Sequence, residues 1–143
     1  MIIIRDATER DAEVLRQLNE RELGYAYPLK DTRKNLKSLL LNEDHRIFVA
    51  EEEGKVIGYV HACHYESLYF PSMKNIMGIA VDHEHRRKHV GTMLLEAVEE
   101  WAVSDGCDGV RLVSGIQRTQ AHEFYRHCGY EGNKKQLNMR KKL

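Results

Sequence analysis

The chain has 143 residues, with 22 Lys or Arg and 22 Asp or Glu, so its formal net charge is zero. This length predicts a single domain, residues 1–143, and the balanced charge argues against nucleic acid as a partner. Three cysteines without paired spacing argue against a disulfide framework and against a structural metal site. Neither a signal peptide nor the roughly 20-residue apolar run of a membrane span is evident, so we expect a cytoplasmic protein with no membrane partner.

The amino-terminal third predicts one strand and two helices. Ile2–Ile4 is a short apolar run typical of a strand. Thr8 followed by Asp11 is typical of a helix start, and the helix that follows has apolar residues at Ala12, Leu15 and Leu18. A turn-rich segment with Tyr25 and Tyr27 comes next, before a second helix with an apolar face of Leu36, Leu39 and Leu40.

The middle of the chain predicts three strands. Ile47–Ala50 and Val56–Ala62 are apolar runs joined through an acidic turn at residues 52–55, which is the pattern of a hairpin. After a break at residues 69–72, the run Ile76–Val81 predicts a third strand.

The period then changes to that of a helix. Val90 opens an amphipathic helical segment with apolar residues at Val90, Leu94, Val98 and Trp101, and Ser104, Asp105 and Gly106 end it. A short strand is predicted at Val110–Val113. Because a strand, a helix and a strand follow in that order, we expect a right-handed crossover and a parallel pair between Ile76–Val81 and Val110–Val113.

The last segments predict a short helix and an edge strand. Apolar residues at 121, 124, 125 and 128 indicate a helix that stops at Gly129, a residue suited to a left-handed helix cap. In the basic tail, Leu137 and Met139 alternate with polar residues, which predicts a strand at the edge of the sheet.

The connection at residues 82–91 is a candidate anion site. It joins the end of a strand to the start of a helix, where unpaired amide groups and the positive end of the helix dipole gather. Arg86, Arg87 and Lys88 add positive charge, Gly91 permits close backbone approach, and Thr92 supplies a hydroxyl. The alternative, equally compatible with this loop alone, is a group of solvated surface cations.

Two motifs in this part of the chain resemble one family. The run IAVDHEHRRKHVGTMLLEAVEEWA resembles the acetyl-coenzyme A motif [Q/R]-x-x-G-x-[G/A] of the GNAT superfamily of N-acetyltransferases, with Arg86 and Gly91 in place. The run SGIQRTQAHEFYRHCGYE resembles the second motif of that family, a helix with Ala-x-x-Phe-Tyr that stops at Gly-Tyr. The opening IIIRDATERDAEVL and the segment EEGKVIGYV are similar to the same family, so the resemblance spans nearly the whole chain.

The resemblance implies an α/β fold with a mixed, mostly antiparallel sheet flanked by helices, in which the parallel pair splays apart. It implies acetyl-CoA as the cosubstrate and transfer of its acetyl group to a primary amine of a small molecule or peptide, by direct attack in a ternary complex. It implies Tyr125 as the acid that protonates the departing thiolate. The residues it assigns to cofactor binding are Ile79, Ala80, Val81, Arg86, Arg87, Lys88, His89, Val90, Gly91, Thr92 and Phe124.

Several positions depart from the family pattern. Many members carry a glutamate where this chain has Met77 and Gly78, so the general base is open among His61, His64, Glu66, Glu22 and water. Arg118 replaces a frequent asparagine, and His83 replaces a frequent proline.

His89 occupies the first glycine position of the phosphate loop. Its amide can face phosphate only if the β-carbon points outward and the backbone angles are ordinary, which is the expectation for this residue. The missing glutamate leaves a second hypothesis open, a non-catalytic acyl-CoA-binding sensor or partner subunit. The oligomeric state is left open as a monomer or a homodimer.

Overall fold

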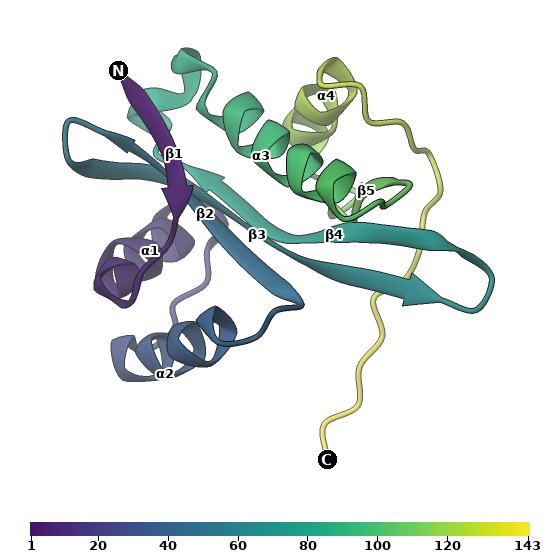
Figure 1. Cartoon of the computed structure of the whole chain (residues 1–143), viewed down its shortest axis with the longest axis horizontal. Coiled ribbons are helices and arrows are strands. Elements are labelled where there is room, and N and C mark those ends of the chain that lie inside the picture. Colours follow the sequence, from purple (N-terminus) through teal and green to yellow (C-terminus); the bar gives the residue numbers. More distant parts are fainter. The chain divides into compact units, whose positions relative to one another are not determined.

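Five strands form one sheet in the order β1-β2-β3-β4-β5 (Figure 1). The computed structural model describes residues 1–143 in two units, Met1–Leu112 and Val113–Leu143, and the sheet belongs to the first. Neighbouring strands are antiparallel except for the parallel pair β4 and β5, which confirms the expected mixed sheet. The strands are β1 (Ile2–Asp6), β2 (His45–Glu52), β3 (Lys55–Ser67), β4 (Phe70–Val81) and β5 (Gly109–Leu112).

Two tight turns connect the three long strands. Between β2 and β3, Glu53 and Gly54 have φ angles of 51° and 79°, and successive left-handed residues produce the twist that a two-residue hairpin requires. The predicted hairpin is therefore confirmed, with longer strands. The predicted third strand begins too late, because Ser67 pairs with Phe70 and the strand starts directly after a second two-residue turn.

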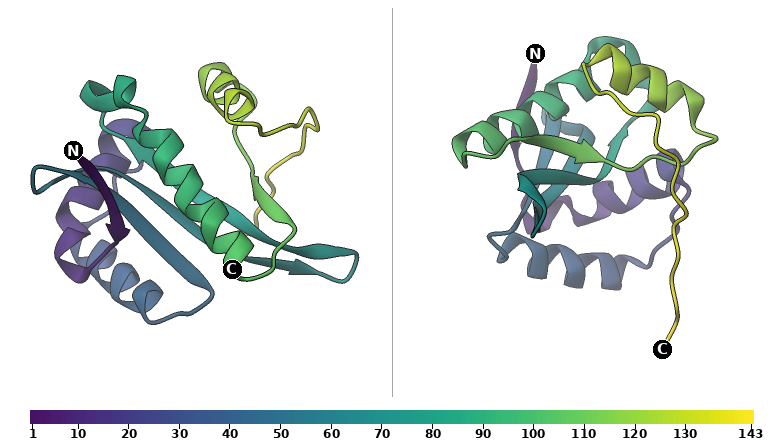
Figure 2. Two further views of the ribbon diagram at one scale, coloured as in Figure 1. Left: turned by 45° about the horizontal axis from the view of Figure 1, so that its top comes forward. Right: turned by 90° about the vertical axis from the view of Figure 1, so that its right-hand side faces the viewer.

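Two helices cover one face of the sheet (Figures 1 and 2). A 3-10 turn, η1 (Glu9–Asp11), leads into α1 (Ala12–Leu18), and the Thr8 amide donates to Asp11 Oδ2 at 2.8 Å, as the helix-start pattern predicts. A π-helical turn, η2 (Asn19–Leu23), and an irregular segment precede α2 (Leu29–Leu40). The core on this face joins residues of α1, α2 and the sheet, among them Leu15, Leu18, Leu36, Ile47, Val49, Tyr59 and Ala80.

A third helix, α3 (Val90–Ser104), covers the opposite face of the sheet (Figure 2). It follows a 3-10 helix, η3 (His83–Lys88). The apolar residues that predicted the helix are buried against the sheet: Val90, Leu94, Val98 and Trp101. The sheet is therefore packed on both faces, and the chain passes from the end of β4 through η3 into α3.

The second unit contains α4 (Thr119–His127). Its Tyr125 ring packs against Phe124 and Tyr130, and Gly129 at φ 93° ends the helix as predicted. The predicted tail strand is wrong, because residues 130–143 form neither strand nor helix. The physical reason is the lack of a buried face: Leu137 and Met139 are 87% and 83% exposed, and the residues around them are charged or amide side chains.

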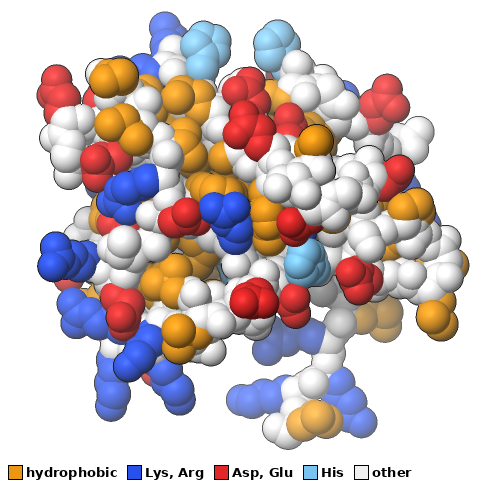
Figure 3. Space-filling view, viewed as in Figure 1, with side chains coloured by type: hydrophobic (Ala, Val, Ile, Leu, Met, Phe, Trp, Pro, Cys, Tyr) orange, Lys and Arg blue, Asp and Glu red, His pale blue; other side chains and the backbone are white.

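Acidic and basic side chains are interspersed over the face shown in Figure 3, and basic ones gather over α2. That helix presents an exposed group of four: Lys30, Arg33, Lys34 and Lys37. None of the helices combines the length and the apolar character needed to cross a membrane.

Candidate acetyl-transfer site

The parallel pair β4 and β5 opens at Met77. The two strands are paired from Met73 with Gly109 to Ile76 with Leu112, whereas β4 remains paired with β3 as far as Val81. Gly78 is opposite His61 and Ile76 is opposite Ala62, so Met77 is an extra, bulged residue at the opening.

Beyond this bulge, the backbone groups on one edge of β4 have no strand partner. The main chain of Ile79, Ala80 and Val81, which the resemblance assigns to the cofactor, lies in this stretch. The opening thus provides main-chain donors and acceptors in a row, as an extended amide-containing arm requires.

The candidate phosphate loop begins immediately after β4. Asp82 caps η3 by accepting a hydrogen bond from the Glu84 amide at 3.0 Å. The first hydrogen bond of α3 runs from the Met93 amide to the His89 carbonyl at 3.1 Å, so the amides of Val90 and Gly91 precede it. The predicted junction of strand, loop and helix is present, and its geometry is that of an anion site at a helix amino terminus.

His89 does not have the ordinary backbone angles that were expected. It lies at φ 60° and ψ 24°, in the left-handed region, while its side chain is exposed. The cause is the sharp change of direction between η3 and α3, which one left-handed residue accomplishes. This conformation explains why a glycine suits the position, since glycine alone adopts it without steric cost.

Two of the three basic residues in the loop are already paired with carboxylates. Arg86 Nη2 donates to Glu22 Oε1 at 2.7 Å, and Lys88 Nζ donates to Glu52 Oε1 at 2.8 Å. Arg87 is exposed. The loop is therefore not simply a group of solvated cations, because Arg86 and Lys88 tie it to η2 and β2.

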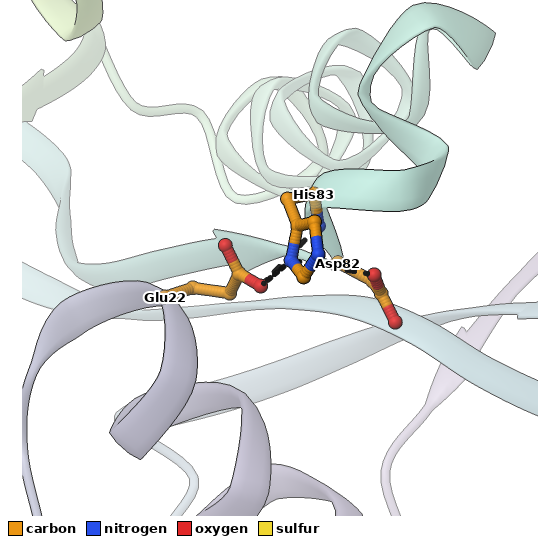
Figure 4. A group of neighbouring side chains, drawn as sticks. All are labelled: Glu22, Asp82 and His83. Carbon is orange, nitrogen blue, oxygen red and sulfur yellow. Dashed lines mark hydrogen bonds and ion pairs between the residues drawn. The ribbon is translucent and has the colours of Figure 1, made fainter.

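Glu22 is the main anchor of this loop (Figure 4). Its side chain is 4% exposed, and one carboxylate oxygen accepts from both the amide and Nδ1 of His83, at 3.2 and 2.9 Å. Burial alone would raise the pKa of Glu22, but the hydrogen bonds from His83 and the charge of Arg86 outweigh it, so the pKa is lowered. The hydrogen bond to Glu22 also raises the pKa of His83. It holds the turn at His83, the position where proline is frequent in the family.

The carboxylates of Glu22 and Asp82 and the ring of His83 have ligand atoms within 4.8 Å of one another. This spacing is compatible with a cation. The Glu22 carboxylate, however, is bonded to Arg86 and His83, and we assign no metal to the group.

The candidate bases lie in different places. Glu22 is bonded to His83 and Arg86 of the candidate phosphate loop. Glu66 is exposed, with a 3.5 Å contact to Ser72 Oγ near the hairpin turn. His64 lies on the α3 side of the sheet, where its Nδ1 is 2.6 Å from Lys74 Nζ and its ring is next to Trp101. Only His61 is opposite Gly78, beside the bulge at Met77.

The proposed acid belongs to the second unit. Tyr125 is 8% exposed, and its burial raises the pKa of the phenol despite the charge of Arg118. The phenol consequently remains protonated at neutral pH, as a proton donor must be. Its reach toward the thioester stays a prediction, as does the assignment of Phe124 to cofactor binding.

Two features of the site were not anticipated from the sequence. Gly58 of β3 allows α3 to begin against the sheet, since a β-carbon at this position would lie 3.0 Å from the Ala80 carbonyl oxygen and 3.2 Å from Val90. His45 contacts His61 across two strands. A lone glycine in a strand signals close backbone approach in general, whereas the His45 contact has no local signal.

A parallel strand pair that opens ahead of a left-handed turn and a helix amino terminus is the arrangement expected of an acyl-CoA-dependent acyltransferase. Comparison with known proteins agrees with this class. The model of the Acetyltransferase (GNAT) family matches residues 12–130. The chain belongs to the GNAT family of acetyltransferases, which confirms the resemblance identified from its motifs.

Relatives match over most of the chain. The N-acetyltransferase YhfO of Bacillus subtilis (strain 168) is 31% identical over 134 residues, covering 90% of this chain and 89% of that protein. Aminoglycoside N(6')-acetyltransferase type 1 of Stenotrophomonas maltophilia is 27% identical over 150 residues, covering 98% of this chain and 93% of that protein. The solved structure of AAC(6')-Iy with the bisubstrate analog CoA-S-monomethyl-acetylneamine has a TM-score of 0.88 at 20% identity, over 100% of this chain and 99% of that one. This last likeness confirms the fold.

Proposed function

We propose that the protein transfers the acetyl group of acetyl-CoA to a primary amine of a small molecule or peptide, within a ternary complex. In this proposal residues 1–143 act as one N-acetyltransferase domain. The observation that carries the proposal is the opening of β4 from β5 at Met77, directly ahead of the anion-site geometry at residues 82–91. Family membership and the aminoglycoside acetyltransferase relative support it.

The residues present fit acetyl-CoA. The main chain of Ile79, Ala80 and Val81 would bind the pantetheine arm along the unpaired edge of β4. The amides at the start of α3 would bind the pyrophosphate, because they precede the first helical hydrogen bond. Arg86 and Lys88 have charged side chains within one loop, and each would exchange a carboxylate partner for a phosphate.

The remaining assignments concern the reacting groups. A neutral amine attacks the thioester carbonyl, and main-chain amides of β4 beside the opening would stabilise the oxyanion. Tyr125 would protonate the departing thiolate, and Phe124 would contact the cofactor. Exposed Tyr25 and Tyr27, at 68% and 49%, provide aromatic surface between η2 and α2 for an acceptor.

Thiol release from acetyl-CoA across an amine panel of kanamycin, spermidine and a tripeptide with a free amino terminus tests the proposal. We expect turnover with at least one amine and a kcat lower by about 10²-fold in Tyr125→Phe. Gly91→Glu should abolish coenzyme A binding in calorimetry, because it places bulk and negative charge at the pyrophosphate position. Binding of coenzyme A without turnover on any amine would instead favour the sensor hypothesis, and unchanged binding in Gly91→Glu would exclude the loop assignment.

A further inference from the structure

Two histidines on adjacent strands share a hydrogen bond. His45 Nδ1 lies 2.9 Å from His61 Nε2, and their ring centroids are 5.1 Å apart. His61 is opposite Ile47 in the β2–β3 register, so the contact to His45 is a diagonal one. At this distance one of the two nitrogens carries the hydrogen and the other accepts it.

His61 lies across β4 from the opening in the sheet. It pairs with Gly78 on β4, one residue beyond the bulge at Met77. Residues directly opposite in an antiparallel pair point to the same face, and a glycine there leaves space next to the imidazole. A β-carbon on Gly78 would lie 3.4 Å from the Tyr59 hydroxyl, so His61 and Tyr59 border the same space.

Other titratable groups do not suit the role of proton acceptor at this point. The Tyr59 hydroxyl donates to Asn19 Oδ1, and burial raises the pKa of Tyr59 to about 12, so the phenol keeps its proton. Glu22 is bonded to the phosphate loop, and His64 lies on the face covered by α3. His61 is thus the remaining candidate next to Gly78, and its Nδ1 makes no other hydrogen bond.

We propose that His61 accepts the proton of the acceptor amine and that His45 relays it to solvent. The inference rests on the proposed acetyl transfer and deepens it. Attack forms the C–N bond and turns the carbonyl oxygen into an oxyanion, leaving a positive nitrogen. That nitrogen loses a proton to His61 Nδ1, the Nε2 proton of His61 passes to His45 Nδ1, and the Nε2 proton of His45 goes to water. The oxyanion then reforms the carbonyl as the C–S bond breaks and the thiolate is protonated.

The pairing explains how a half-buried histidine can serve. Burial, and to a lesser degree His45, lowers the pKa of His61 to about 4, so the ring is neutral at physiological pH and a lasting imidazolium there is unfavourable. Transfer of the second proton to His45 avoids that charge. His45 lines an open cavity of about 480 Å³ beside the end of α2, which gives the proton a route to water.

Replacement of His61 tests the assignment, with whichever amine of the kanamycin, spermidine and tripeptide panel is acetylated fastest. We expect His61→Gln and His61→Ala to lower kcat by about 10²-fold while the affinity for coenzyme A stays unchanged. Added imidazole should restore part of the activity of His61→Ala only. His45→Gln should lower kcat by a smaller factor, and imidazole should not restore it.

Glu66→Gln is the matched control, since Glu66 is an alternative base on the same strand and lies near the turn between β3 and β4. It should keep parental kcat. Parental kcat in folded His61→Gln would overturn the relay while leaving acetyl transfer intact. A parent protein that turns over none of the amines would instead overturn the proposed function, so the two failures are distinguishable.

Discussion

Replacing His89 with glycine is expected to stabilise the protein. His89 is one of two non-glycine residues with positive φ, at 60°, and its side chain is exposed, so little packing is lost on truncation. A non-glycine residue in this region carries a steric cost of about 1–3 kcal/mol. Glycine loses about 0.5–1 kcal/mol more conformational entropy on folding, which offsets part of the gain.

The net expectation for His89→Gly is a free energy of unfolding higher by about 1 kcal/mol, equivalent to a rise in Tm of about 2–4 °C for a chain of this size. Urea denaturation measures it as a higher midpoint at unchanged slope. His89→Ala is the matched control, because it removes the imidazole but retains the β-carbon. Glu53→Gly, at φ 51° in the β2–β3 turn, should give a similar gain at a residue outside the loop.

Equal stabilities of His89→Gly and His89→Ala would refute the argument from backbone strain. The coenzyme A affinity of His89→Gly should equal or exceed that of the parent, since the left-handed turn and its amides are retained. If both His89→Ala and His89→Gly lost affinity for coenzyme A, the imidazole, and not the backbone, would be the part of His89 that serves the loop.

Three further outcomes follow from the packing and the charges. Gly58→Ala should cost about 1–3 kcal/mol in urea denaturation, because its β-carbon would lie 3.0 Å from the Ala80 carbonyl oxygen, whereas Gly132→Ala meets nothing within 4 Å and should be neutral. Lys74 is fully buried, with Nζ 2.6 Å from the half-exposed Asp105 and 3.8 Å from the Trp101 ring centroid. Lys74→Met, which keeps most of the side-chain volume, should change the free energy of unfolding by less than about 1 kcal/mol. Lys74→Ala should lower it by about 3 kcal/mol, because truncation leaves a cavity. The contact between Glu22 and His83 lowers the pKa of Glu22 and raises the pKa of His83. The stability that this contact provides is therefore lost as the pH falls through the folded pKa of Glu22, below 4.5, and as the pH rises through the folded pKa of His83, above 6.5. Stability against pH should therefore be flatter in Glu22→Gln at both ends, and an unchanged profile would contradict the anchoring role.

Much of the fold is determined by local patterns. The apolar run Ile47–Ala50 and the helical period that begins at Val90 predict β2 and α3, because a strand buried on both faces and a helix buried on one face are each recognised from neighbouring residues. The motif around Arg86 and Gly91 likewise predicts the junction of strand, loop and helix at residues 82–91, since the strand end, the turn and the helix start are contiguous. The tail shows the limit of such patterns, because the alternation of two apolar residues without a partner strand does not form a strand.

The identity of the residues around the opening was decided by the tertiary structure. The sequence by itself left four side chains and water as candidates for the base, and it contains no signal that relates His45 to His61 or Glu22 to Arg86. Sixteen residues separate the first pair and 64 the second. The bulge at Met77 sets which β3 residue is opposite Gly78, and a shift of one residue would bring the other face of the strand to the opening. Strand register and helix packing, which depend on contacts between distant segments, therefore decide the chemistry at a site whose loop the sequence alone predicts.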